Sequence, residues 1–229
     1  MRILLVALLI AYSVDSSAHG EIVLDEFDIF AFTESPLMAG DFVTATNVGP
    51  LAATRDIRIL SSTTRPTGTL RAGTISRAGP TALAADLATT DPRDRASIGF
   101  QFWYDIDATD LTEGGQNNAI LIDFLQTETS GTPLSTRAFV GRANTTVETP
   151  VSPTPFTLAI LFDDIGANFS QIQSLNFTVE TPQPPGNEDF NLLATIDRVR
   201  VGFVVPEPVG MTLAASALAF ALTRRWRSI

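Results

Sequence analysis

The chain has 229 residues, a formal net charge of −10 and no cysteine. The missing cysteine excludes disulfides, thiolate metal sites and cysteine nucleophiles. An acidic surface repels phosphate backbones, so we expect no nucleic-acid partner. His19 is the single histidine, which leaves the rest of the chain without imidazole for a catalytic triad or a metal site.

Residues 1–18 have the features of a secretory signal peptide. Arg2 precedes an apolar run from Ile3 to Tyr12, and small residues end the segment at Ala18. An apolar run of about ten residues is too short for a stable span but suits the central region of a cleaved signal. Cleavage after Ala18 would make His19 the first residue of an exported chain, and we interpret a histidine at that terminus as inert.

Residues 19–204 read as one all-β domain. Short runs of β-branched and aromatic residues recur between clusters of Gly, Pro, Asn and Asp. We expect a two-sheet sandwich, with a jelly-roll order favoured over an immunoglobulin-like one. Residues Thr81–Ala88 could form a short helix. Strands are predicted at Ile22–Phe30, Phe42–Thr46, Asp56–Ser61, Thr69–Ile75, Ile98–Ile106, Ala119–Gln126, Thr136–Arg142, Phe156–Phe162, Ser174–Glu180 and Leu192–Val204.

Two of these strands carry the strongest patterns. Along Ile98–Tyr104, large apolar residues alternate with Gly99, Gln101 and Trp103, so the apolar row is predicted to face the core. The run Ala119–Leu125 is apolar on both faces apart from Asp123, which predicts a strand covered on both sides. Asp123 then needs a partner, and the last strand offers two arginines. A structural ion pair or a solvated edge position is favoured over a catalytic role. The two candidate partners are Arg198 and Arg200.

The spacing of four acidic residues hints at a calcium-binding loop, because hard oxygen ligands on a turn suit Ca²⁺. The segment lacks the glycine and the register of an EF-hand, and ordinary solvated acidic loops are commoner. We therefore expect no cofactor. The four residues are Asp105, Asp107, Asp110 and Glu113.

Two classes of function remain open for this domain. A structural or glycan-binding protein could use Trp103 or Tyr104 to stack on sugars, although core packing is the favoured role of both rings. The alternative is a carbohydrate-active hydrolase on a jelly roll, which would need two carboxylates at catalytic separation. We favour the non-enzymatic class. The carboxylates available to a hydrolase are Asp105, Asp107, Asp123, Asp163 and Asp164.

Residues 205–229 contain three units in a fixed order. Pro206, Glu207 and Pro208 form a rigid, exposed linker, because proline fixes φ and removes a backbone donor. The uncharged run Val209–Thr223 would give a helix of roughly 22 Å, short against a hydrocarbon core of about 30 Å but tolerable if arginines snorkel. A basic cluster ends the chain and should stay cytoplasmic. That cluster is Arg224, Arg225 and Arg227.

This order of proline motif, apolar run and arginine cluster resembles the PEP-CTERM sorting signal of Gram-negative bacteria. The resemblance implies recognition of Pro206-Glu207-Pro208 by an exosortase-type membrane protease. It also implies an inner-membrane anchor before processing, and then delivery to the cell surface or extracellular matrix, where an exopolysaccharide is a further partner. Val209 departs from the pattern, since a small or polar residue is commoner after the motif. An ordinary C-terminal membrane anchor is the alternative.

The sorting hypothesis predicts a defect in maturation. Replacement of Pro206, Glu207 and Pro208 by alanine should leave the full-length protein in the inner membrane, because the protease loses its recognition element. Cell fractionation and immunoblotting would measure this. Unchanged processing and surface delivery would contradict a role for the motif.

Overall fold

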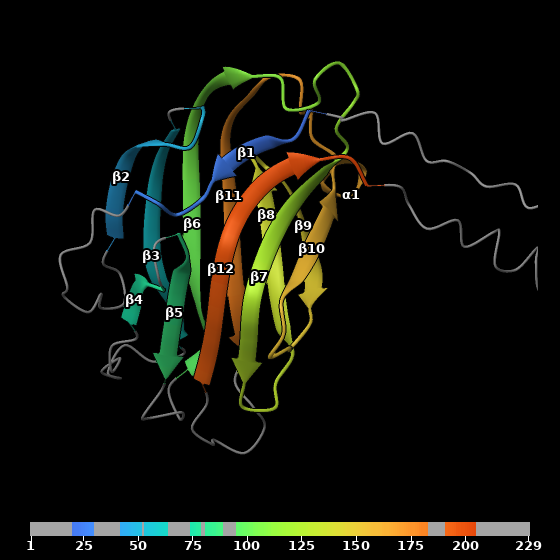
Figure 1. Cartoon of the computed structure of the whole chain (residues 1–229). Coiled ribbons are helices and arrows are strands. Elements are labelled where there is room, and N and C mark those ends of the chain that lie inside the picture. Colours follow the sequence, from blue (N-terminus) through green and yellow to red (C-terminus); the bar gives the residue numbers. More distant parts are fainter. Residues whose placement is uncertain are drawn as a thin grey trace, which may run out of the picture.

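A computed structural model describes residues 20–29, 42–51, 53–63, 74–78, 81–88, 95–182 and 191–204. These residues form a sandwich of two antiparallel sheets (Figure 1), which confirms the prediction of an all-β, two-sheet domain. Within this described part, no helix has the length and apolar character needed to cross a bilayer. The predicted signal peptide, its cleavage site, the proline motif, the apolar run and the arginine cluster lie outside the described residues.

The front sheet faces the viewer in Figure 1, and its two longest strands, β7 (Ala119–Thr129) and β12 (Asn191–Gly202), pair with each other in its interior. A short strand, β1 (Ile22–Asp25), pairs with the C-terminal part of β12. The N-terminal part of the same edge of β12 pairs with β5. The remaining strands follow in the order β10 (Phe156–Leu161), β7 (Ala119–Thr129), β12 (Asn191–Gly202), β5 (Leu83–Ala88) and β4 (Thr74–Arg77).

The back sheet lies behind it and contains the longest strand, β6 (Arg95–Thr109). A single-turn helix, α1 (Phe162–Ile165), follows β10 and ends at Gly166, whose φ of 70° is the left-handed conformation that terminates helices. The order in the back sheet is β2 (Phe42–Val48), β3 (Ala53–Thr63), β6 (Arg95–Thr109), β11 (Ile172–Pro182), β8 (Leu134–Val140) and β9 (Ala143–Thr149).

The last eight strands pair in a nested order. β5 pairs with β12, β6 with β11, β7 with β10 and β8 with β9, all antiparallel. The first strand of the set therefore pairs with the eighth, the second with the seventh, and so on inward. This is the arrangement of a jelly roll, in which a long hairpin is rolled into two facing sheets. The strands β1 to β4 extend this core at its edges.

The predicted aromatic row of β6 forms the centre of the core. Ile98, Phe100, Phe102 and Tyr104 are all 0–1% exposed. The Phe102 ring centroid lies 5.2 Å from that of Phe177 on the neighbouring strand β11. Each fully buried ring contributes roughly 1.5–3 kcal/mol through the area that it removes from water. The alternation of this strand thus fixes which face of the back sheet looks inward.

A buried ion pair joins the two sheets inside this apolar core. Asp25, at the end of β1 in the front sheet, accepts hydrogen bonds from Arg55 Nη1 on β3 and from the Tyr104 hydroxyl on β6, the latter at 2.9 Å. The backbone N–H of Phe27 donates to the same carboxylate at 2.7 Å, and its ring lies 5.0 Å from the Arg55 guanidinium. Arg55 and Asp25 are 1% and 0% exposed. Burial raises the pKa of Tyr104, and the adjacent Asp25 carboxylate raises it further.

The structure corrects several local predictions. Residues Leu83–Ala88 form strand β5 and not a helix, because Leu83, Ala85 and Leu87 alternate into the core. Strand β9 was not predicted, since its outward residues are polar. β1 ends at Asp25 rather than at Phe30, because the chain turns at Phe27, whose φ is +51°. The segment Phe162–Ile165, part of which was predicted as strand, is α1.

Two consecutive asparagines hold both ends of the described domain at one corner. Asn117 Nδ2 donates to the carbonyl of Gly20 at 3.2 Å. Asn118 makes two hydrogen bonds to Val204, donating to its carbonyl at 2.8 Å and accepting from its N–H at 2.7 Å. The first and last described residues are therefore fixed next to each other.

The core assignment predicts a large loss of stability for Phe102→Ala. Removal of this buried ring should cost about 3–5 kcal/mol of unfolding free energy, because the site cannot collapse fully around the cavity. Denaturant titration of the purified chain would measure the loss. Leu125→Ala, at a position 37% exposed, serves as the control and should lose much less, on the order of 1 kcal/mol, because this side chain is only partly buried. A loss below about 1 kcal/mol for Phe102→Ala would contradict the core role.

Candidate functional site: the outer face of the back sheet

Trp103 is the most prominent side chain on the outer face of the back sheet. The alternation of β6 turns it outward between the buried Phe102 and Tyr104, and it is 44% exposed. Tyr104 packs in the core as expected, whereas the expectation of core packing was wrong for Trp103. A large ring exposed to solvent on the outer face of a sheet is a candidate binding group, because it offers apolar area on a rigid support.

The strand register places polar groups on either side of this ring. Asp56 of β3 is opposite Trp103 on one side, and Asn176 of β11 is opposite it on the other. Beyond Asn176 the same row continues to Phe139 of β8. Asn176 Oδ1 is buried and has no hydrogen-bond partner among the described residues. The row therefore offers two aromatic rings separated by an amide.

The adjacent row is a hydrogen-bonded polar strip. Arg58 Nε donates to Gln101 Oε1 at 2.5 Å, and Gln101 Nε2 donates to Thr178 Oγ1 at 3.3 Å. At the far end, Arg137 pairs with Glu180 at 3.4 Å, and its guanidinium carbon lies 5.8 Å from the Phe139 ring centroid. Gln101 and Thr178 are buried, so the middle of this strip does not protrude, whereas the longer side chains of Arg58 and Arg137 lie at its two ends. Together with the Trp103 row, we name these residues the Trp103 face. Its members are Asp56, Arg58, Gln101, Trp103, Arg137, Phe139, Asn176, Thr178 and Glu180.

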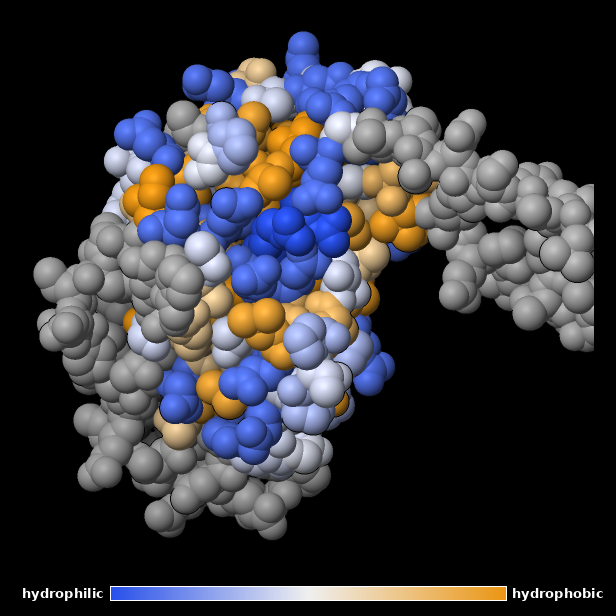
Figure 2. Space-filling model, viewed as in Figure 1, coloured by the Kyte–Doolittle hydropathy of each residue, from blue (hydrophilic) through white to orange (hydrophobic). Residues whose placement is uncertain are grey.

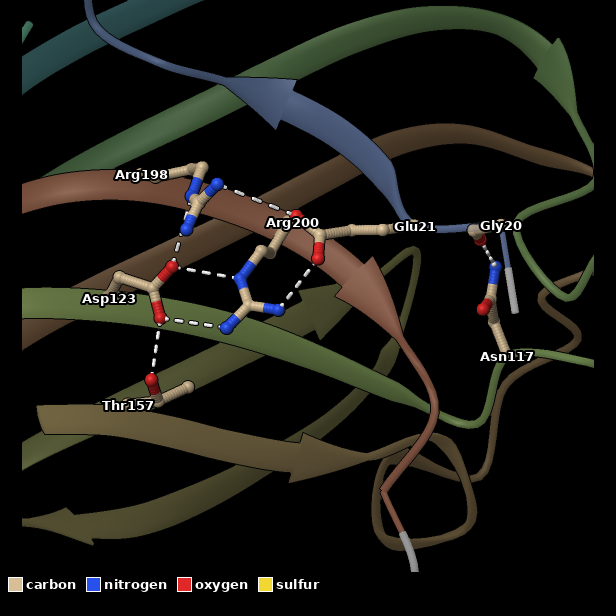
Figure 3. A network of polar contacts seen from close by, with 7 residues as sticks. All are labelled: Gly20, Glu21, Asn117, Asp123, Thr157, Arg198 and Arg200. Carbon is tan, nitrogen blue, oxygen red and sulfur yellow. Dashed lines mark hydrogen bonds and ion pairs between the residues drawn. The ribbon is translucent and has the colours of Figure 1, made fainter. Parts of the chain in front are cut away.

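The outer face of the front sheet is different, because its charges are satisfied by one another. Hydrophilic side chains gather near its middle (Figure 2). Asp123 on β7 forms ion pairs with two arginines of β12 (Figure 3). Arg200 binds both carboxylate oxygens, at 2.8 and 3.1 Å, and Arg198 Nε donates at 3.1 Å. Thr157 Oγ1 donates at 2.6 Å (Figure 3). The prediction that Asp123 pairs with these arginines is confirmed.

Glu21 closes this network from the start of the domain. Its carboxylate lies 3.0 Å from Arg200 Nη1 and 3.6 Å from Arg198 Nη1 (Figure 3). Burial raises the pKa of Asp123, but hydrogen bonds from Arg200 and Thr157 outweigh it, so the pKa lies below its usual value. We assign Asp123 a structural role, as predicted, because both of its oxygens are occupied.

The other acidic candidates are dispersed. Asp105 and Asp107 are exposed on the outer side of β6, and Asp163 and Asp164 lie on α1. Asp110 caps its own turn, because its carboxylate accepts hydrogen bonds from the Thr112 N–H, the Thr112 hydroxyl and the Gly114 N–H. The hydrogen bond from the Thr112 hydroxyl is the main cause that lowers the pKa of Asp110. In the described part of the chain, no three His, Cys, Asp or Glu side chains gather as a metal site.

Two shallow hollows adjoin each other at the end of the sandwich, near α1. They have volumes of about 420 and 430 Å³ and share Ala167 and Asn168. In the first, the rings of Phe162 and Phe169 stack with centroids 3.9 Å apart. Asp163 is the one carboxylate among its lining residues, so this hollow does not supply the pair that glycoside hydrolysis requires.

Comparison with known proteins gives weak structural similarity. No protein-family model and no curated protein matches the sequence. The family 11 carbohydrate-binding module of the cellulase Lic26A-Cel5E of Clostridium thermocellum is 12% identical, with 82% of this chain and 98% of that one covered and a TM-score of 0.38. CBM28, specific for non-crystalline cellulose, is 15% identical (63% and 88% covered, TM-score 0.37). A Stig cyclase, Fisc, from Fischerella sp. TAU is 10% identical (79% and 96%, 0.37). At these TM-scores the likeness identifies neither family nor function.

The Asp123 network predicts a stability that depends on acidic pH. The folded-state pKa of Asp123 is lowered, so its contribution is present above the unfolded pKa of about 3.9 and is lost as pH falls through the folded value. Asp123→Asn should lower stability at pH 7 by about 1–3 kcal/mol and should flatten the loss of stability between about pH 5 and 2. Urea midpoints across this range would measure both effects. Asp107→Asn, at an exposed site, is the control, and an equal slope in Asp123→Asn and the parent chain would contradict the assignment.

Proposed function

We propose that the chain is an exported surface or extracellular-matrix protein whose sandwich binds a glycan on the Trp103 face. The observation that carries this proposal is the exposure of Trp103 in a row between Asp56 and Asn176. An indole stacks on the apolar C–H face of a sugar ring, while carboxylate and amide groups beside it bind the hydroxyls. The export and sorting parts of the proposal rest on the terminal sequences.

The charges of the Trp103 face favour a neutral glycan. Asp56 and Glu180 balance Arg58 and Arg137, and the chain as a whole is strongly acidic. An anionic polysaccharide would be repelled at long range, whereas a neutral one would not. The two rings of the row, Trp103 and Phe139, lie on strands two positions apart, which is roughly 10 Å. That distance suits an extended chain of at least two sugar rings lying across the strands.

A carbohydrate-active hydrolase is the second candidate, because Asp105 and Asp107 point to the same side of β6 as Trp103. Both residues are exposed on the outer face of β6. Glycosidases instead hold an acid and a second carboxylate on either side of an enclosed bond. The open arrangement therefore supports binding over hydrolysis.

The proposal predicts that Trp103→Ala weakens glycan binding. Loss of one stacked ring, worth roughly 1.5–3 kcal/mol, should weaken affinity about ten- to hundredfold. Affinity electrophoresis of the purified chain in gels that contain cellulose derivatives, β-glucan, β-galactan or anionic alginate would measure it. Leu125→Ala, on the front sheet, is the matched control and should migrate like the parent chain.

Three outcomes separate the candidates. Retardation by a neutral polysaccharide that Trp103→Ala removes would support the Trp103 face. Migration unaffected by every polysaccharide, or equally retarded for both variants, would contradict it. Release of reducing ends that Asp105→Asn abolishes would favour the hydrolase instead.

A further inference from the structure

Asn117 has a hydrogen-bonding arrangement that its amide cannot satisfy. This side chain is 3% exposed, and its Nδ2 atom faces three oxygens. They are the carbonyl of Gly20 at 3.2 Å (Figure 3), the carbonyl of Leu111 at 3.3 Å and Glu113 Oε2 at 3.4 Å. An amide nitrogen carries two protons, so it cannot serve three acceptors fully. All three distances also exceed the usual 2.9–3.0 Å of such bonds.

The other end of the same amide has the opposite problem. Asn117 Oδ1 is buried and accepts no hydrogen bond from any described residue. Buried polar atoms in proteins are nearly always paired, and an exception points to a missing water or ion. A half-turn of the amide would exchange its two ends and bring Oδ1 among the three oxygens. Oδ1 would then lie within 3.4 Å of three other oxygens, which is favourable only if a cation binds beside them.

We propose that these four groups bind Ca²⁺: the carbonyls of Gly20 and Leu111, the Glu113 carboxylate, and Oδ1 of the rotated Asn117. Calcium holds its oxygens at 2.3–2.6 Å, so ligands at right angles are about 3.4 Å apart. The oxygen that replaces Nδ2 would lie 3.2, 3.3 and 3.4 Å from its neighbours, which matches this spacing. Mg²⁺ requires bonds of 2.0–2.1 Å and hence ligands about 2.9 Å apart. The cluster is therefore too wide for Mg²⁺.

The surroundings can complete the coordination. Gly20 and Glu113 are exposed, so water can fill the remaining positions of a six- to eight-coordinate ion. The Glu113 carboxylate already lies against Gly20, since a Cβ on that glycine would be 2.6 Å from Oε2. Of the acidic residues that suggested a calcium loop in the sequence, Glu113 alone belongs to this cluster. With one carboxylate, the site should be weak, in the range of about 10⁻⁴–10⁻³ M that extracellular calcium modules use.

Bound calcium would fasten the start of the domain to the loop between β6 and β7. Gly20 precedes β1, the strand that carries Asp25 into the core. Since the ion binds the folded chain, it should raise the melting temperature by mass action. The proposal is independent of glycan binding, because the Trp103 face shares no residue with this cluster.

The test compares calcium binding of the full chain with three variants after treatment with a chelator. Equilibrium dialysis against radioactive Ca²⁺ should give one ion per chain, and the melting temperature should rise with millimolar Ca²⁺ more than with Mg²⁺. Glu113→Gln should weaken binding at least tenfold. Asn117→Asp should tighten it at least tenfold, because it presents oxygen in either rotamer and adds a charge. Asp107→Asn removes an equal charge outside the cluster and should bind like the parent chain.

The Asn117→Asp variant decides between a cation and an ordinary amide. If Nδ2 serves only as a donor to the three oxygens, the new carboxylate would be repelled by them, and no cation would offset that repulsion. Calcium affinity would then stay equal or fall, and that result would overturn the proposal. No binding at 10 mM Ca²⁺ (about ten times the weakest expected constant), or loss of binding in Asp107→Asn, would overturn it as well. If Asn117→Asp folds only when Ca²⁺ is added, as followed by circular dichroism, the site is supported. The Glu113→Gln variant, at an exposed position, tests the site whether or not Asn117→Asp folds without Ca²⁺.

Discussion

The contact on which the fold depends is the buried ion pair between Asp25 and Arg55. A charge without a partner inside a protein costs several kcal/mol, so each of these residues is tolerated only while the other is in place. Asp25 lies in the front sheet and Arg55 in the back sheet, which means that the sheets must face each other in one position for the pair to close. The Tyr104 hydroxyl completes the carboxylate's shell from the central strand β6.

This constraint also determines what the outer surfaces present. Once Tyr104 and Phe102 are fixed inward, the alternation of β6 leaves Trp103 outside, next to the groups that the neighbouring strands supply. The outer face of the front sheet also carries charged side chains, but Asp123 binds two arginines and a threonine there. A charged surface that satisfies itself is a poor site for a ligand. The Trp103 face, with its exposed ring, is the better one.

Where the sequence carries a strict pattern, the fold could be predicted. The alternation Ile98–Tyr104 indicated the core face correctly, and the isolated acid in Ala119–Leu125 led to its arginine partners. Prediction failed where tertiary contacts override local preference. Alanines that favour a helix lie in strand β5, because Leu83 and Leu87 are needed in the core. Strand β9 is an edge strand with polar outward residues, so it lacks the apolar run that marks a strand.

The candidate sites were less predictable, since they depend on register and on backbone groups. Nothing local in the sequence indicates that Asn176 lies opposite Trp103, because the two strands are far apart along the chain. The Asn117-Asn118 dipeptide reads as a turn signal, and its contacts with Gly20 and Val204 follow only from the closure of the domain. Carbonyl oxygens, which make up half of the proposed calcium cluster, have no sequence signature.

The meeting of both domain ends at one corner has a mechanical consequence. A force that separates Gly20 from Val204 acts across β1 and the end of β12, and would open the pair Ile22–Val201 before Val23–Arg200, one contact after another. Tension between the Val204 end and a ligand held on the back sheet instead runs along β12. That strand is bonded to β7 on one edge and to β5 and β1 on the other, so many hydrogen bonds carry the load together. The domain should therefore resist unfolding far better when it is pulled between Val204 and a ligand on the back sheet than when its two ends are drawn apart.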